Sequence, residues 1–429
     1  MIEPARPTIT YRKTILPNGL RLITEYMPHT RSVAINIFIG TGSRYESENE
    51  AGVAHFIEHV CFKGTHRRPS SLEICSVIEG YGGMINAGTD KEITVYWAKV
   101  AQNHFRSALD VLADIILNAT FDPAEIEKER LVIAEEIHSS LDSPAQRACL
   151  LIDELLWPNH PLGRDIAGTN ESLAVIDRPL MMSYLAREYQ PGNTVVAIAG
   201  GIDEDRVLQM VEKTLGHWQP GPPRPGYLPY VPSPGRTVRI ERKDTEQTQL
   251  CLAVPGLAVT DSDRFTLGIL NVILGEGMSS RLFSTIRDSL GLAYHIQSFA
   301  EHFKDTGAWT IVAGVDNNNL KVAITAILEQ LARLKESIPE EELTKAKELY
   351  KGRTLLRMED SRNVAGWMGA QEILHDYAYT VDEVLSRVDA ITTDDLKRIA
   401  RKLIVPEQLR LAVVGPVDPD THLEDLLKL

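Results

Sequence analysis

The chain has 429 residues, of which 43% are hydrophobic, and its formal net charge is −14. This length suits two globular domains, while the acidic balance argues against nucleic acid as a partner, and no apolar run approaches the ~18 residues of a membrane span. The N-terminus carries no secretory signal, and the four cysteines lack C-x-x-C spacing, which together predict reduced thiols and a cytoplasmic protein.

Short strands are predicted at the start of the chain. Pro17-Asn18-Gly19 is a turn signal between the two β-prone segments Tyr11–Leu16 and Leu20–Glu25. The apolar run Ser32–Gly40 follows and is typical of a buried strand. The chain therefore opens with a sheet.

Residues 51–64 form the first predicted helix, which ends at Gly64. His55 and His59 are four positions apart on one face, where both can bind one metal ion, and Glu58 beside them can take a proton from a metal-bound water. The alternative is a pair of hydrogen-bonded core histidines, but burying three polar groups is costly unless a partner such as a metal offsets the cost. The apolar face has helical spacing and consists of Val53, Phe56, Ile57 and Val60.

Further helices and strands follow this motif. A helix at Ser71–Gly80 leads to Gly82-Gly83 and then to two paired strands, Met84–Asn86 and Thr94–Val100. The glycine pair either lets a backbone approach closely or simply marks a tight turn. Another helix is predicted at His104–Asn118.

The helix predicted at residues 122–141 starts with Asp as N-cap and Pro at the first helical position. A catalytic zinc site uses three protein ligands and keeps one position open, so a His pair needs a third ligand. Glu129 and Glu136 are two turns apart on one face of this helix, and either could point at the metal. Glu135 is interpreted as a surface charge.

The next segments predict a loop at Asn159–Thr169, a helix at Leu180–Tyr189 and a strand at Thr194–Ile198. Residues 216–236 contain seven prolines, too many for a helix or a central strand, so this segment is extended and semi-rigid. The domain boundary is placed there. The predicted divisions are a metal-bearing domain at 1–215, a linker at 216–236 and a second domain at 237–429.

The second half of the chain repeats the first. Gly40 and Gly256 each end an apolar strand, and Pro123 and Pro339 each open a charged helix, both at an offset of 216. Features around the strand near residue 200 recur at an offset of 215, which indicates an internal duplication. We predict an α+β fold of two similar domains, each a mostly antiparallel sheet flanked by helices. The offset carries the metal-site positions to residues that are not ligands, namely Asn271, Leu274, Gly275 and Gly352.

Together these motifs resemble the pitrilysin–insulinase family of zinc peptidases, in its short bacterial branch that is similar to the mitochondrial processing peptidase. The order H-x-x-E-H is the inverzincin signature. In the family the third ligand is a Glu at the spacing of Glu136, 77 residues beyond His59, and Glu129 matches a further acidic position near the site. The resemblance thus implies zinc on His55, His59 and Glu136. The matching segments are His55–His59 with Phe62–Thr65, Gly82–Thr89 and Asn159–Thr169.

The second domain carries another element of this family, the Gly-rich segment Gly275–Phe283 followed by Arg287 and Tyr294. In active members an Arg and a Tyr at this spacing complete the catalytic site. A Tyr hydroxyl can donate to the oxyanion that forms when water attacks a peptide carbonyl. Without the resemblance, Arg287 would be interpreted as a surface charge and Tyr294 as a core residue.

The resemblance implies a zinc endopeptidase with one Zn²⁺ per chain and Glu58 as the general base. It also implies that a substrate peptide lies extended along a sheet edge at Asn86 and Ala87, inside a chamber of four such domains and hence in a homodimer. Two alternatives stay open: a non-catalytic peptide-binding or structural subunit of the same fold, and the active half of a heterodimer.

Overall fold

The computed structural model describes residues 11–232, 235 and 237–428, and it divides into two compact units. The first unit contains residues up to 137, 165–228 and 354–384, and the second contains 138–164, 229–353 and 385 onward. These units correct the predicted contiguous halves, because residues 138–164 and 354–384 each belong to the unit of the other half. The change at residues 228 and 229 lies within the proline-rich segment.

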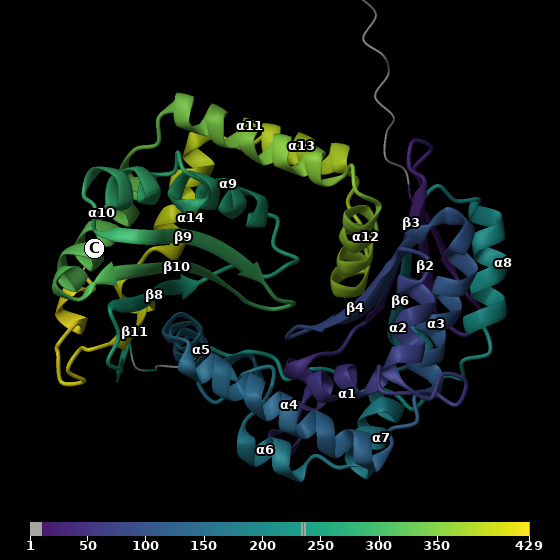
Figure 1. Cartoon of the computed structure of the whole chain (residues 1–429). Helices are drawn as coiled ribbons and strands as arrows, with labels where there is room; N and C mark the ends of the chain where they lie inside the picture. The colour runs from purple at the N-terminus through teal and green to yellow at the C-terminus, as the bar shows by residue number, and fades with distance from the viewer. Residues whose placement is uncertain (1–10, 233–234, 236, 429) are drawn as a thin grey trace, which may run out of the picture. The chain divides into compact units, whose positions relative to one another are not determined.

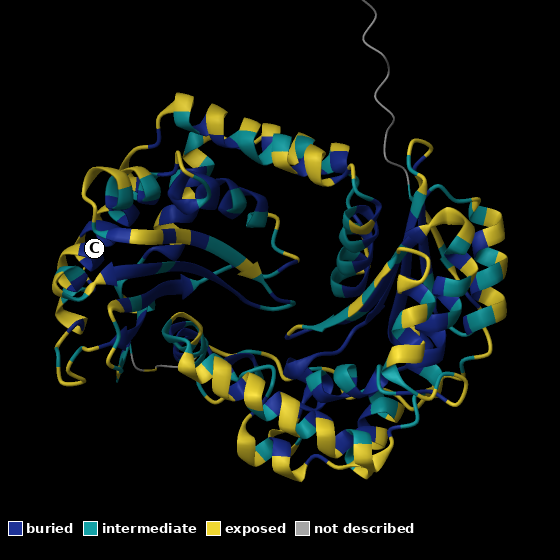
Figure 2. Cartoon of the chain, in the orientation of Figure 1, coloured by how far each residue is buried: buried dark blue, intermediate teal, exposed yellow. Residues whose placement is uncertain are grey.

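The first unit is built on a six-stranded sheet. Its strands are β1 (Arg12–Ile15), β2 (Arg21–Tyr26), β3 (Ser32–Ile39), β4 (Met84–Thr89), β5 (Thr94–Ala101) and β6 (Thr194–Gly200). They lie in the order β1-β2-β6-β3-β5-β4, and all neighbours are antiparallel except β2 and β6. β3 and β6 are buried almost throughout (Figure 2), which explains their unbroken apolar sequences, whereas β4 lies at an edge.

Helices cover both faces of this sheet. The helices of the first unit are α1 (Val53–Cys61), α2 (Ser71–Glu79), α3 (Phe105–Asn118), α4 (Pro123–Asp142), α6 (Asn170–Val175), α7 (Arg178–Glu188), α8 (Glu204–Leu215) and α12 (Ser361–His375), together with the start of α13 (Val381–Asp389). The end of α4, from residue 138, and the rest of α13, from residue 385, are counted with the second unit. α3 and α8 pack on one face and α12 on the other (Figure 1). The buried sides of α1, α3 and α4 share one apolar core.

The second unit contains a five-stranded sheet in the order β7-β11-β8-β10-β9. Its strands are β7 (Val238–Arg242), β8 (Gln247–Pro255), β9 (Ala293–His302), β10 (Gly307–Asp316) and β11 (Arg410–Gly415), and its helices are α5 (Pro144–Leu156), α9 (Arg264–Gly275), α10 (Leu320–Glu336), α11 (Glu340–Arg357) and α14 (Thr393–Leu403). This order repeats β2-β6-β3-β5-β4, and the outer pair β7 and β11 is again parallel. The predicted fold of two similar domains is therefore confirmed.

Two helices explain why the units are not contiguous. α5 packs on β8 and β11 of the second unit, and α12 packs on β3 and β6 of the first unit. The apolar side of α5 joins a core with residues of the second sheet, so burial of that side decides to which unit the helix belongs. Among the described residues, no helix combines the length and apolar character needed to cross a bilayer.

Candidate active site

α1 positions the residues of the H-x-x-E-H motif. The helix begins after Gly52, whose φ of 94° is a left-handed conformation that favours glycine. The carboxylate of Glu46 accepts the N–H groups of Gly52 and Ala54 at 2.9 and 2.8 Å, which stabilises the positive end of the helix. The predicted apolar face is buried, and the two His and the Glu of the motif stay half-buried beside it.

α4 supplies the carboxylate that meets these histidines. Its isoleucines pack in the core, and Glu136 reaches the space above α1. The Nε2 atoms of His55 and His59 lie 3.8 and 3.7 Å from Glu136 Oε2. Within the described part of the chain, these three side chains are the one group of at least three His, Cys, Asp or Glu whose ligand atoms all lie within 4.8 Å of one another.

This group fits a zinc ion. Two zinc bonds of about 2.1 Å at a tetrahedral angle put ligand atoms roughly 3.4 Å apart, close to the 3.7 and 3.8 Å between imidazole and carboxylate here. Burial, and then the neighbouring His59, lower the pKa of His55 to about 4. The imidazole of His55 is therefore neutral near pH 7, which is the form that binds a metal.

Glu129 lies behind His59. The side chain of Glu129 is 7% exposed, and its Oε2 is 3.1 Å from His59 Nδ1 while its Oε1 is 2.6 Å from Lys63 Nζ. A carboxylate at Nδ1 holds the proton on that nitrogen and leaves Nε2 free for a metal. The two His differ in this respect, because His55 Nδ1 is buried and has no hydrogen-bond partner among the described residues.

Glu58 is placed as a candidate base. The hydroxyl of Thr89 on β4 donates to Glu58 Oε2 at 2.6 Å. Burial raises the pKa of Glu58 above its ordinary value, although the Thr89 hydroxyl and His59 oppose that rise. A carboxylate with a raised pKa is a better proton acceptor near neutral pH than an exposed one.

The predicted substrate strand is β4, at the edge of the first sheet. Asn86 and Ala87 pair with Trp97 and Tyr96 of β5 on one side, and no described strand pairs with β4 on the other side. The side-chain oxygen of Asn86 accepts the N–H of Ala87 at 2.8 Å. Main-chain groups on an unpaired edge can bind an extended peptide.

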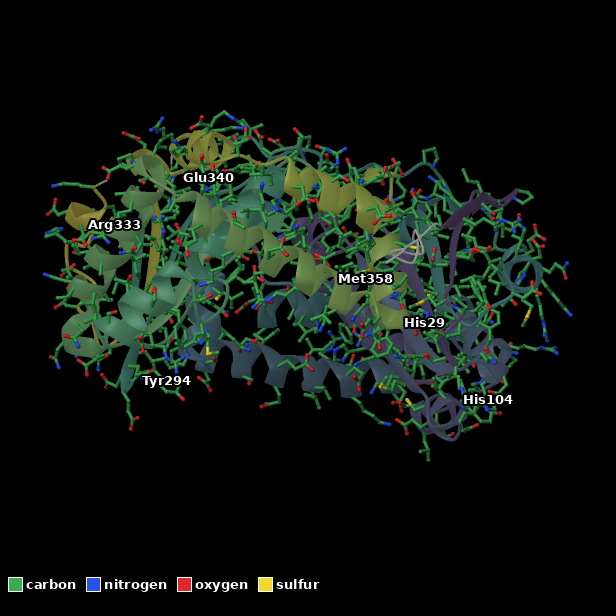
Figure 3. The ribbon with its side chains drawn as sticks, turned by 90° about the horizontal axis from the view of Figure 1, so that it is seen from above. His29, His104, Tyr294, Arg333, Glu340 and Met358 are labelled. Atoms are coloured by element: carbon green, nitrogen blue, oxygen red, sulfur yellow. The ribbon has the colours of Figure 1, made fainter. Side chains whose placement is uncertain are left out.

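Arg287 and Tyr294 lie in the second unit, whereas the metal-binding group lies in the first. Arg287 is on the π-helix Phe283–Ser289, and its Cζ is 5.1 Å from the ring centroid of Tyr294 at the start of β9. The Tyr294 residue is 76% exposed (Figure 3), which contradicts its interpretation as a core residue. The structure thus brings this pair together and leaves the phenol open.

The sequence analysis did not single out Lys63, Thr89 or Glu46. Lys63 lies four positions after His59, and that helical spacing was the available signal for Lys63. Thr89 and Glu46 act through contacts with other elements, which no local pattern indicates. The four cysteines are free, and none of them is among the three side chains of the candidate metal-binding group.

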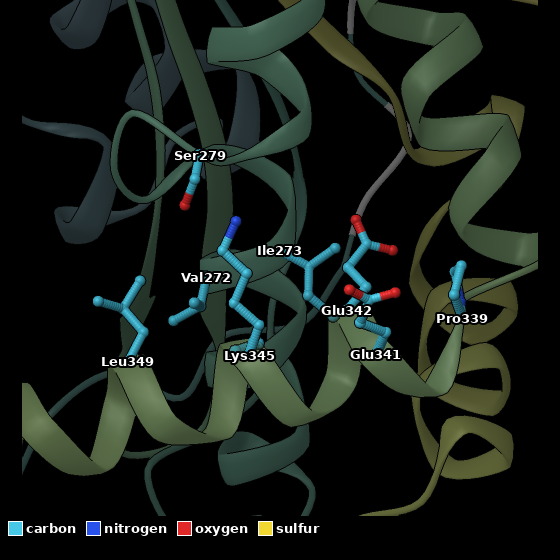
Figure 4. A pocket seen from close by; sticks show the side chains of 9 residues that line it. Val272, Ile273, Ser279, Pro339, Glu341, Glu342, Lys345 and Leu349 are labelled. Atoms are coloured by element: carbon cyan, nitrogen blue, oxygen red, sulfur yellow. The ribbon is translucent and has the colours of Figure 1, made fainter.

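A pocket lies between α9 and α11, the two helices of the second unit that correspond to α1 and α4 of the first. α9, α11 and the segments next to them line this open pocket of about 290 Å³ (Figure 4). Its lining residues are Val272, Ile273, Ser279, Pro339, Glu341, Glu342, Lys345, Ala346 and Leu349.

Comparison with known proteins gives consistent matches over the chain. Residues 21–170 match Insulinase (Peptidase family M16), and residues 176–350 match the Peptidase M16 inactive domain. The uncharacterized zinc protease YmxG of Bacillus subtilis is 38% identical over 402 residues, which cover 93% of this chain and 97% of the relative. An uncharacterized zinc protease of Streptomyces coelicolor is 34% identical over 95% of this chain and 90% of its own length.

Solved structures share the fold. A protease from Helicobacter pylori matches with a TM-score of 0.88 and 23% identity, covering 95% of this chain and 100% of that one. A chain of complex III₂ from Candida albicans matches with a TM-score of 0.83 and 19% identity, covering 97% and 100%. One architecture therefore occurs both in a protease and in a chain of complex III₂, so function must be argued from the site.

Proposed function

Because the chain belongs to the insulinase family of peptidases (peptidase family M16), we propose that it is a zinc-dependent endopeptidase for extended or unfolded peptides, with one Zn²⁺ per chain. The observation that carries this proposal is the convergence of His55, His59 and Glu136 beside a half-buried Glu58. When bound, zinc supplies Lewis-acid chemistry that acidifies a water and polarises a peptide carbonyl.

The protein's own residues handle the proton. Glu58 takes a proton from the attacking water and returns it to the leaving amine, a role for which its raised pKa is suited. Thr89 fixes one oxygen of Glu58 by its 2.6 Å hydrogen bond. Glu129 holds the tautomer of His59 that keeps Nε2 free, and Lys63 compensates the buried charge of Glu129.

The substrate pairs with the edge strand β4. Main-chain hydrogen bonds at Asn86 and Ala87 read little side-chain sequence, so cleavage preference is loose. The side-chain oxygen of Asn86 already accepts a hydrogen bond from the Ala87 N–H. A peptide that accepts a hydrogen bond from this N–H must therefore displace the Asn86 side chain.

We further propose that the active form is a homodimer, in which Arg287 and Tyr294 complete the site of the partner. The exposed phenol of Tyr294 can donate to the oxyanion formed during attack on the carbonyl. Two alternatives to a homodimeric endopeptidase remain. One is a non-catalytic subunit of the same fold, as the likeness to a complex III₂ chain suggests, and the other is the active half of a heterodimer.

The decisive experiment measures zinc and cleavage on the same purified chain. An unstructured peptide is digested and the products are read by mass spectrometry, for the wild type and for Glu58→Gln. Zinc-dependent cleavage that falls by about 10²–10⁴-fold in Glu58→Gln, with zinc retained, supports the mechanism. Full activity of Glu58→Gln contradicts it, and bound zinc without any cleavage favours the non-catalytic subunit.

A mixing test decides whether the sites are shared between chains. A Glu58→Gln chain is combined with a Tyr294→Phe chain, each expected to be inactive alone. If Tyr294 serves the partner, the mixed dimer contains one intact site and regains activity toward half of normal. If Tyr294 serves its own chain, every site keeps a lesion and no activity returns.

A further inference from the structure

Two cysteines that are far apart in the sequence touch in the second unit. Cys149 on α5 and Cys251 on β8 are 102 positions apart, yet their Sγ atoms are 3.6 Å from each other. Cys251 is 1% exposed, whereas Cys149 is only half-buried at the boundary of the same apolar cluster. Both are free thiols, so the pair combines a thiol that solvent can reach with a neighbour that it cannot.

We propose that Cys149 and Cys251 are an oxidation site, at which a peroxide converts the two thiols into an intramolecular disulfide that ties α5 to the sheet of the second unit. A disulfide has an S–S distance of about 2.05 Å, so the two sulfurs must approach by roughly 1.5 Å. The packing of α5 on β8 keeps the two cysteines close enough for such an approach.

The chemistry balances with peroxide as the oxidant. The Cys149 thiolate attacks one peroxide oxygen, which forms a sulfenic acid and releases water after proton uptake. The Cys251 sulfur then attacks the sulfenic sulfur, the S–S bond forms, and the sulfenic oxygen leaves as a second water. Two thiols thus lose two electrons and two protons, and the peroxide is reduced to two molecules of water.

The surroundings of the pair set the order of these steps. The hydrogen bond from Cys251 lowers the pKa of Cys149, although burial and the nearby carboxylates of Asp153 and Glu301 oppose this effect. The pKa of Cys251 is instead raised by its contact with Cys149 and by burial. Cys149 is therefore the thiol that reacts first, and Cys251 is the one that resolves the sulfenic acid.

The disulfide would link the second sheet to one of the two segments that belong to the unit of the other half of the chain, residues 138–164 and 354–384. α5 belongs to residues 138–164, which leave the first half of the chain to join the second unit. Closing a loop of 102 positions restricts the unfolded chain strongly, so the oxidised protein should have a melting temperature higher by about 5–10 °C. Oxidation would thereby hold the exchanged helix in place.

The test treats the full chain with hydrogen peroxide and uses Cys61→Ala/Cys75→Ala, which keeps only the pair. Intact mass spectrometry should show the loss of two hydrogens, peptide mapping should show a Cys149–Cys251 cross-link, and a thiol reductant should reverse both. In the matched control Cys61→Ala/Cys75→Ala/Cys251→Ser, no cross-link forms and dimedone traps the Cys149 sulfenic acid.

Two outcomes overturn the proposal. In one, both thiols of the Cys61→Ala/Cys75→Ala chain are still alkylated when the chain is unfolded after peroxide treatment. In the other, Cys149 is oxidised to sulfinic acid or cross-links to a second chain while Cys251 stays a thiol. Circular dichroism before treatment verifies that each variant is folded.

Discussion

Helices α1 and α4 of the first unit correspond to α9 and α11 of the second. The two pairs occupy the same place in the duplicated fold but differ in the side chains that lie between the helices. In the first unit the residues between the helices are buried apolar side chains. At the offset of 216, the second unit has a smaller residue at one of the compared positions and a charged residue at another, and the four residues line a pocket of about 290 Å³. The compared positions are Phe56 and Val272, Ile57 and Ile273, Ile126 and Glu342, and Ile133 and Leu349.

The ligand positions differ even more. Asn271 replaces His55, and its side-chain oxygen accepts Ser298 Oγ at 2.7 Å and Trp309 Nε1 at 3.1 Å. Gly275 replaces His59, and a Cβ there would lie 2.6 Å from the backbone N of Ser298. At these two positions the second unit thus satisfies the polar side chain of Asn271 internally and leaves no room for a side chain at Gly275. The comparison teaches that the duplicated fold accommodates the candidate ligand group in one copy and forms without it in the other.

The largest expected effect is on zinc affinity, and it should occur at Glu136 but not at Gly352, the counterpart of Glu136 in the second unit. Glu136→Gln should lower zinc affinity by well over 100-fold, because it weakens a direct ligand. Gly352→Ala should leave zinc unchanged. Competition with a chromogenic chelator measures both. Zinc retained by Glu136→Gln would move the third ligand to Glu129 or Glu135.

Matched strand positions should differ in their response to pH. Burial, and then the Glu204 carboxylate, raise the pKa of Glu25 on β2 to about 8. In the unfolded chain the pKa of this carboxyl is near its ordinary value of 4.5, so its contribution to stability is complete below pH 4.5 and is lost as pH rises through 8. Between pH 5 and 8 the free energy of unfolding of the wild type should therefore fall by roughly 2–4 kcal/mol because of Glu25, and Glu25→Gln should not show this fall.

Glu241 on β7 is the control for Glu25, 216 positions later. Its carboxylate pairs with Arg147 at 2.8 Å, so Glu241→Gln should lose a partly exposed ion pair, about 1 kcal/mol or less, without the same pH dependence. Urea unfolding at several pH values measures both variants. Parallel stability profiles for the wild type and Glu25→Gln would refute the assignment.

A smaller effect on zinc affinity is expected from Glu129 and Lys63, which support the ligand His59 without binding the metal. Glu129→Gln should weaken zinc binding by about 10–100-fold, because it loosens the partner of His59 Nδ1. Lys63→Met should act in the same direction but less, since it removes only the charge that faces Glu129. Lys345, which lies 216 positions beyond Glu129, supplies the control Lys345→Gln. Equal zinc affinity in all three variants would show that Glu129 does not support the site.

The smallest effects should have opposite signs at two glycines of the second unit. Gly275→Ala should destabilise the protein by about 1–2 kcal/mol, because the new Cβ meets backbone at Ser298. Gly352→Ala should stabilise it by about 0.5–1 kcal/mol, because this position on α11 has nothing within 4 Å of a Cβ and alanine favours a helix. Thermal unfolding measures both, and destabilisation by Gly352→Ala would contradict the open position.

Local spacing predicted much of the site, because helical periodicity places His55 and His59 on one face whatever surrounds the helix. The choice between Glu129 and Glu136 needed distances between two helices, which periodicity does not provide. The exchange of α5 and α12 was missed for a similar reason. An amphipathic pattern shows that a helix has an apolar face, but it does not tell which sheet covers that face. The contact between Cys149 and Cys251 depends on the same packing.

The central claim is that one zinc ion binds in the first unit, at His55, His59 and Glu136, and none in the second. Native mass spectrometry of the purified chain counts bound zinc most directly. We expect one zinc per chain in the wild type and in Glu58→Gln, and none in His55→Ala/His59→Ala. Two zinc ions per chain, or zinc retained after loss of both histidines, would contradict the account.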